Sequence, residues 1–171
     1  NVPLWILGSS LFGAQLAAML GLPFAFASHF APAAMDQAID IYRESFKPSE
    51  QLEKPHVMLG YNVCAADSPE EADLLRSSSL QSFVNMRKGA AGKLPPPIAN
   101  FEATLSAPEQ QMLHQMARCA AVGNADMIED QIKKFLQETE ADELIIASSI
   151  FDHEARLHSY ELTAEVAGRI N

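Results

Sequence analysis

The sequence predicts an α/β fold in which short parallel strands alternate with helices. Four short segments are mostly apolar, at residues 2–7, 22–27, 56–66 and 143–148. Apolar strands of this kind are typical of a parallel sheet whose two faces are both covered by helices. Helix start and stop signals lie between these segments, so the order of elements is that of right-handed βα units.

The first two helices are indicated by their ends and by their spacing. Ser9 or Ser10 can cap a helix that runs to about residue 20, where Gly21 can end it in the left-handed conformation. A second helix opens at Pro32, and apolar residues recur along one of its faces. These residues are Met35, Ala38, Ile39, Tyr42 and Phe46.

Two capping boxes and a proline-rich segment organise the second half of the chain. Residues 68–71, Ser-Pro-Glu-Glu, predict a helix start with proline at the first helical position. Residues 87–105 contain two glycines and three consecutive prolines, which excludes a regular element and predicts an irregular insertion loop. A second capping box at 106–109 opens the next helix, and Asn124 can cap another.

Composition restricts the class of partner. The 171 residues carry a formal net charge of −10, which argues against nucleic acid or an anionic membrane as the main partner. No uninterrupted apolar run is long enough to span a membrane, and no basic segment precedes the apolar start. The two cysteines are not in a CxxC pair, so we expect reduced thiols in a cytoplasmic protein.

The length suits a single domain over residues 1–171, with two possible architectures. Four βα units fit either an open doubly wound sheet or half of an eight-stranded barrel. The sequence begins inside a predicted strand, so we expect the chain to be a piece of a longer protein. In both architectures ligands bind at the carboxyl ends of the strands. Four clusters fall there, at residues 8–10, 27–29, 63–66 and 148–153.

The turn formed by Gly8, Ser9 and Ser10 leads directly into a helix. Its free backbone amides, two hydroxyls and positive helix end suit a phosphate, although a serine that merely caps the helix explains the same pattern. An unrelated phosphate-handling α/β enzyme would also use such a turn.

Histidines are the other candidate functional residues. His29 follows a predicted strand and can contact a ligand ring or act as an acid or base. His153 and His158 are five residues apart and do not share a helix face well, so no metal site is expected. Asp152 is read as the cap of the last helix.

Residues 5–32, WILGSSLFGAQLAAMLGLPFAFASHFAP, resemble the luciferase-like monooxygenases, the flavin-dependent family that includes bacterial luciferase. Further similar segments lie at 122–136, 141–144 and 149–161, so the resemblance spans nearly the whole chain. It implies the C-terminal half of a (β/α)8 TIM barrel. Residues 2–7 match the fifth strand and 144–148 the eighth, and 87–105 fall where the family has an insertion.

The resemblance also implies a cofactor and its contacts. The family usually uses reduced FMN, with F420 in some branches, and the luciferase-like branch favours FMN. The matching cofactor-binding positions are Gly8, Ser9, Ser10, Gly13 and Ala27. At Ser9 this sequence departs from bacterial luciferase, which has an acid at that position. His29 is the predicted catalytic residue, near the reactive edge of the flavin.

The resemblance therefore implies that the chain is part of a flavin-dependent monooxygenase, which oxidises a small organic substrate with O2 and reduced FMN. A flavin reductase is among the partners that it implies. Half a barrel leaves two open sheet edges and an uncovered apolar face. We therefore expect this piece alone to be inactive, and to pair with a missing N-terminal half or form a homodimer. The alternative is a non-catalytic, dimeric half-barrel that binds flavin or phosphate.

Overall fold

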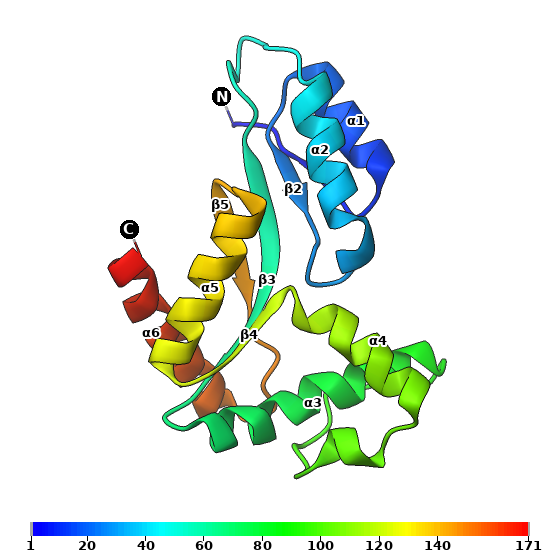
Figure 1. Ribbon diagram of the computed structural model, residues 1–171, viewed down its shortest axis with the longest axis vertical. Helices are drawn as coiled ribbons and strands as arrows, with labels where there is room; N and C mark the ends of the chain where they lie inside the picture. Colours follow the sequence, from blue (N-terminus) through cyan, green and yellow to red (C-terminus); the bar gives the residue numbers. More distant parts are fainter. Residues whose placement is uncertain (1, 171) are drawn as a thin grey trace. The chain divides into compact units, whose positions relative to one another are not determined.

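The computed structural model describes residues 2–170 and has the predicted parallel strands and covering helices (Figure 1). The chain divides into two compact units. The first unit contains the residues up to Tyr61 together with Leu136–Ile146. The second contains Asn62–Phe135 and the residues from Ala147 on. Strand β3 (Val57–Ala65) runs from the first unit into the second.

The first unit is built on short parallel strands. β1 (Ile6–Gly8) pairs with β2 (Phe24–Phe26), and β2 pairs with the beginning of β3. β5 (Glu143–Ala147) also pairs with β3. At the start of that contact, the backbone amide and carbonyl of Val57 bond to Asp142. The predicted strand order along the chain is therefore confirmed for this unit.

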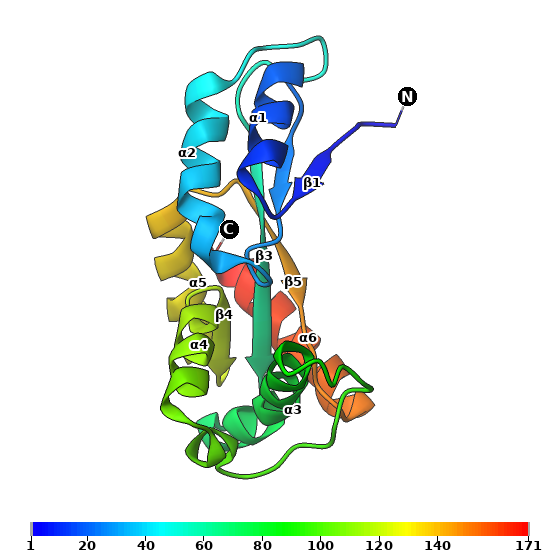
Figure 2. The same ribbon diagram turned by 90° about the vertical axis from the view of Figure 1, so that its right-hand side faces the viewer.

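Two helices cover one face of these strands. α1 (Leu11–Leu20) and α2 (Met35–Ser45) lie side by side, with the short 3-10 helix η1 (Pro32–Ala34) leading into α2 (Figures 1 and 2). α1 buries only small residues, which lets it approach the sheet closely. Alternate residues of β2 and β3 point to the covered face. These residues are apolar and buried: Phe24, Phe26, Val57 and Leu59.

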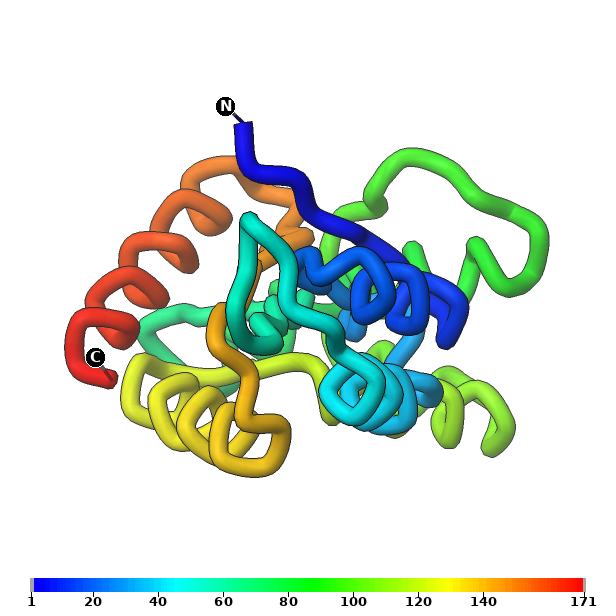
Figure 3. Tube along the Cα trace, turned by 90° about the horizontal axis from the view of Figure 1, so that it is seen from above, coloured from blue at the N-terminus to red at the C-terminus, as the bar shows by residue number. Residues whose placement is uncertain are grey.

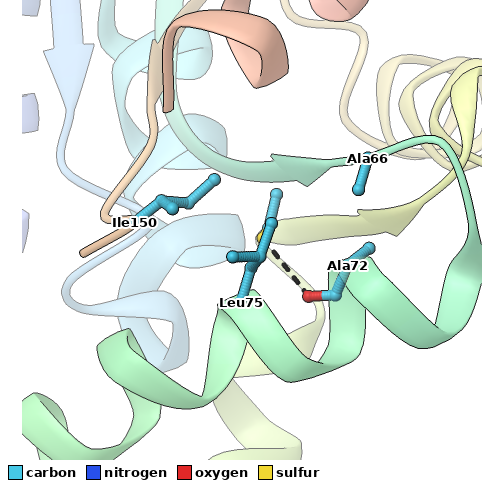
Figure 4. Packing of buried hydrophobic residues seen from close by; sticks show 5 residues of the cluster. Ala66, Ala72, Leu75 and Ile150 are labelled. Carbon is cyan, nitrogen blue, oxygen red and sulfur yellow. Dashed lines mark hydrogen bonds between the residues drawn. The ribbon is translucent and has the colours of Figure 1, made fainter. Parts of the chain in front are cut away.

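The second unit has its own core. α3 (Pro69–Arg87) packs on the end of β3, where Cys64 and Ala66 meet Ala72 and Leu75 of the helix and Ile150 (Figure 4). The Cys64 thiol donates to the carbonyl oxygen of Ala72, 3.4 Å away. The remaining helices are α4 (Ala107–Ala117), α5 (Ala125–Thr139, whose last residues belong to the first unit) and α6 (His153–Ile170).

The segment predicted as an irregular loop leaves α3 in a wide excursion (Figure 3). Arg87, its first predicted residue, is the last of α3; residues 88–105 have no strand or α-helix and contain the short 3-10 helix η2 (Phe101–Thr104). Side chains of α3 hold it in place. Ser77 accepts a bond from the Ile98 amide at 2.9 Å, and Gln81 donates to the Pro96 carbonyl at 2.9 Å. Arg76 forms an ion pair with Glu102.

One strand was not predicted. Ala120–Gly123 forms β4, which pairs in parallel with the second half of β3, and it is not among the four strands that the sequence predicts. Four small residues are too few to show the alternation of apolar and polar residues that marks a strand. They form a strand because the second half of β3 offers an unpaired edge. β1 and β2 are also shorter than predicted, at three residues each. Among the described residues, no helix has both the length and the apolar character needed to cross a membrane.

Candidate functional site

The turn after β1 presents an open helix end. Ser10 stands at the N-cap of α1 in an extended conformation, and within residues 2–170 its side chain makes no capping hydrogen bond. Both Ser9 and Ser10 are exposed. The first amides of a helix have no partner inside the helix. These amides and two hydroxyls are therefore available to an anion, and the positive helix end favours one.

Two glycines hold this turn close to its strand. A Cβ placed on Gly13 would lie 3.5 Å from the Gly8 Cα and from a ring carbon of Phe24. Gly13 is buried, and its Cα packs against the strand. Its backbone amide belongs to the open first turn of α1. The amide of Ala27 donates to the Gly8 carbonyl at 2.9 Å, which joins the ends of β1 and β2.

The loop after β2 carries Ser28 and His29, and both bond to the same atom. The carbonyl oxygen of Gly60 accepts from the Ser28 hydroxyl at 2.6 Å and from the His29 amide at 3.1 Å. The His29 ring lies against the Gly60 backbone. Burial lowers the pKa of the His29 imidazole from its usual value of 6.5, so the ring is neutral at physiological pH.

The second unit contains the other two predicted clusters, and α6 fixes both. The Ala65 amide donates to the Ser159 hydroxyl at 2.9 Å, and the Ser148 amide donates to the Tyr160 hydroxyl at 3.0 Å. Ser159 is fully buried. α6 therefore satisfies the backbone at the carboxyl end of β3 and just after β5.

The polar residues at the start of α6 bond to one another. Asp152 accepts from the Ala155 amide at 2.9 Å, which confirms it as the helix cap. His153 Nδ1 lies 2.8 Å from Arg156, and His158 pairs with Asp67 at 2.8 Å. The hydrogen bond to Asp67 raises the pKa of His158. No group of three or more metal-ligating side chains occurs within the described part of the chain.

A pocket of about 360 Å³ lies elsewhere in the second unit, between α3, β4 and the start of α5. Its polar lining comes from Asp73, Arg76 and Gln131. None of the predicted catalytic or cofactor-binding residues lines it.

The structure thus brings Gly8, Ala27 and His29 to neighbouring strand ends of the first unit, with Ser9 and Ser10 in the adjoining turn. Sequence reasoning missed Gly60, Ser159 and Tyr160. A signal existed for Gly60, because glycine inside a strand often marks the close approach of another group. Ser159 and Tyr160 gave no such signal, since their bonds span more than ten residues of sequence.

Comparison with known proteins identifies the relatives of this chain. The sequence model described as luciferase-like monooxygenase matches residues 1–143. A luciferase-like monooxygenase of Escherichia coli (strain K12) is 50% identical over 166 residues, which cover 97% of this chain and 50% of that protein. The crystal structure of apo-MsnO8 is similar with a TM-score of 0.86 and 32% identity, covering 98% of this chain and 51% of that one.

More distant structures share the fold alone. The oxygenating constituent of 3,6-diketocamphane monooxygenase from Pseudomonas putida, in complex with FMN, has a TM-score of 0.59 at 15% identity, over 96% of this chain and 47% of that one. The coenzyme F420-dependent tetrahydromethanopterin reductase of Methanopyrus kandleri has a TM-score of 0.60 at 12% identity. The match covers 96% of this chain and 49% of that one. This chain spans about half the length of the curated relatives it matches. Its α/β fold is half of the TIM barrel of the structural neighbours.

Proposed function

Because the chain belongs to the luciferase-like monooxygenase family, we propose that it supplies one half of the active site of a flavin-dependent monooxygenase. The enzyme would oxidise a small organic substrate with O2 and reduced FMN. When bound, the reduced flavin supplies the electrons that activate oxygen. The residues of this chain bind and orient the cofactor and supply a neutral imidazole beside it.

The observation that carries this proposal is the open end of α1. In the described part of the chain Ser10 makes no side-chain cap bond to this first turn, and the adjoining Ser9 is an exposed residue. This arrangement fits the terminal phosphate of FMN, because a helix end with free amides favours a phosphate dianion. F420 also carries a phosphodiester, so the helix end alone does not select between them. The structural neighbour in complex with FMN supports FMN as the cofactor. The F420-dependent neighbour supports F420 as the second candidate.

His29 is the residue proposed to lie near the reactive edge of the flavin. Its burial favours the neutral ring, which can donate one hydrogen bond and accept another. A neutral imidazole can hold or move a proton at its Nε2 atom without first losing one to solvent.

Exposed apolar residues on the strands support the proposal of a covering partner. Leu7 on β1 is 74% exposed and Ile145 on β5 is 57% exposed, and apolar strand residues left open in this way indicate a surface that another element covers. We propose that an N-terminal half covers them, as the half-length match to the relatives suggests. A homodimer is the alternative arrangement and would suit a non-catalytic flavin-binding half-barrel. A flavin reductase would supply reduced FMN in the cytoplasm.

The test is FMN binding by this chain, alone and together with the N-terminal half. Quenching of flavin fluorescence should show binding, and Ser10→Ala should weaken it roughly tenfold to hundredfold, the loss of one hydrogen bond to a charged group. Ser106→Ala is the matched control, because it removes a hydroxyl at the N-cap of another helix, α4. Equal effects of both substitutions would refute the phosphate site at Ser10.

A second measurement separates the two candidate functions. Oxygen consumption that depends on NAD(P)H and a flavin reductase should appear only when both halves are present. Tight flavin binding without such consumption would instead favour the non-catalytic half-barrel.

A further inference from the structure

We propose that Gly60 of β3 is a positioning residue that holds the His29 ring in one orientation at the carboxyl ends of β2 and β3. The proposal rests on the role of His29 proposed above, and it adds the element that fixes this side chain. Gly60 acts in two ways: it leaves room for the ring, and its carbonyl oxygen bonds to the loop that carries it.

The first effect is steric. A Cβ built on Gly60 would lie 2.0 Å from His29 Nδ1 and 2.6 Å from Cε1. Real Cβ contacts are never this short, so the ring occupies the space that any other residue would fill. The contact extends along the ring to Cγ at 3.2 Å, so an added Cβ would require the whole imidazole to turn away.

Backbone conformation does not explain this glycine. Among the described residues, the glycines with positive φ are Gly21, Gly89 and Gly123. Gly60 lies within the regular strand β3, where glycine costs stability because it lacks a side chain that packs. The room that it leaves for His29 is therefore the physical reason for a glycine at this position.

The second effect is a double hydrogen bond. The Gly60 carbonyl accepts from the Ser28 hydroxyl and from the His29 amide, at 2.6 and 3.1 Å. Leu59, the preceding residue, is the last of β3 that is in register with β2. The two bonds continue the β2–β3 contact one step past the end of β2, so the loop leaves the sheet in a fixed direction.

The space above Gly60 and the two hydrogen bonds to its carbonyl together position His29. The amide bond fixes the backbone of His29, and the Gly60 surface fixes the ring. Ser28 is fully buried, so water does not compete for its bond to the carbonyl. The imidazole is thereby ordered before any ligand binds, which is how a group beside a cofactor avoids an entropy cost on binding.

A double-mutant cycle tests the proposal without any flavin. Gly60→Ala should lower the melting temperature by about 2–10 °C, the range for overpacking in a chain of this size. The same substitution in a His29→Ala background should cost much less, because the opposing ring is gone. Gly168→Ala is the matched control, since no atom lies within 4 Å of a Cβ there, and it should not lower the melting temperature.

The result that would overturn the proposal is an equal cost of Gly60→Ala in both backgrounds. If Gly60→Ala does not fold, recovery of folding in the His29→Ala/Gly60→Ala variant supports the proposal, and failure of that variant contradicts it.

A second readout reports on the ring itself. In an NMR titration, His29 should have a pKa below 6.5, and Ser28→Ala should move it toward 6.5 as the loop loosens. An unchanged His29 titration and chemical shift in Ser28→Ala would contradict the hydrogen-bonding part of the proposal.

The functional consequence is measured with both halves present. His29→Ala and Gly60→Ala should alter the pH profile of turnover in the same way, while Gly168→Ala leaves it unchanged. If His29→Ala does not affect turnover, the proposed role of His29 fails, but the cycle and the titration still decide whether Gly60 positions the ring.

Discussion

Tyr42 offers the sharpest test of how the first unit is held together. Its side chain on α2 is fully buried, and its hydroxyl bridges two backbone groups. The hydroxyl donates to the Leu22 carbonyl at 2.9 Å and accepts from the His56 amide at 3.1 Å. Leu22 precedes β2 and His56 precedes β3, so one atom fixes the starts of two neighbouring strands. Burial raises the pKa of Tyr42, which keeps the hydroxyl protonated as a donor.

The expected cost of Tyr42→Phe follows from these two bonds. A neutral hydrogen bond contributes about 0.5–1.5 kcal/mol net, and a buried partner left unsatisfied raises the loss toward the upper value. Phenylalanine preserves the ring contacts with Phe24 and Phe46, at 5.4 and 5.6 Å between centroids. The substitution should therefore lower the free energy of unfolding by about 2 kcal/mol, or the melting temperature by about 4–8 °C.

The assay is thermal unfolding combined with hydrogen exchange of the His56 amide. Tyr42→Phe should increase exchange at this amide, because its acceptor is removed. Tyr160→Phe makes the same chemical change at a residue that is 39% exposed and whose hydroxyl accepts a bond from the Ser148 amide, and it should cost less than 1 kcal/mol. If Tyr42→Phe costs no more than Tyr160→Phe and leaves His56 exchange unchanged, the bridging hydroxyl does not have the role assigned to it.

Three further predictions follow from local geometry. Gly13→Ala should leave FMN affinity unchanged. It should add about 0.5–1 kcal/mol of stability, because the new Cβ meets its neighbours at an ordinary 3.5 Å and alanine favours the helix. Weaker FMN binding would show that the ligand contacts the Gly13 Cα. Cys64 should react with a thiol reagent only when the protein unfolds, since burial raises its pKa to about 12; a native-state reaction as fast as that of a free cysteine would contradict this. Bonds from Lys88 and Ser106 lower the pKa of Glu109 to about 2, so Glu109 stabilises the native state above its ordinary pKa of 4.5 and loses this effect as pH falls from 4.5 through 2. Melting temperatures of wild type and Glu109→Gln should accordingly differ at pH 6 and converge near pH 2; a constant difference would refute the linkage.

Sequence patterns predicted the parts of this fold that local chemistry determines. The capping sequence at Ser68 gave the start of α3, and its side chain accepts from the Glu71 amide at 3.2 Å. Gly21 ends α1 with a φ of 63°, as a left-handed cap should. Both features depend on residues within four positions of each other, and a single sequence displays them directly.

Features that depend on distant residues were not predictable in the same way. β4 exists because the second half of β3 offers an unpaired edge, and nothing in its four small residues indicates this. Ser159 and Tyr160 are ordinary helix residues until the fold places them against Ala65 and Ser148. The pattern of a helix face shows that residues are buried or polar, but it does not show which backbone group they meet.

Gly60 lies between these two cases and shows what a sequence can contribute to a site. A glycine inside a strand costs stability, so its presence signals that something occupies the space of its side chain. The sequence marks the position but not the occupant, because His29 is 31 positions away. The predicted site contained His29 without the surface that orders it. A histidine at a strand end is common, whereas the His29 ring fills the place of a missing side chain and its loop bonds twice to the Gly60 carbonyl, which restricts how the ring can turn. That restriction, and not the residue type alone, is what distinguishes His29 as a candidate active-site group.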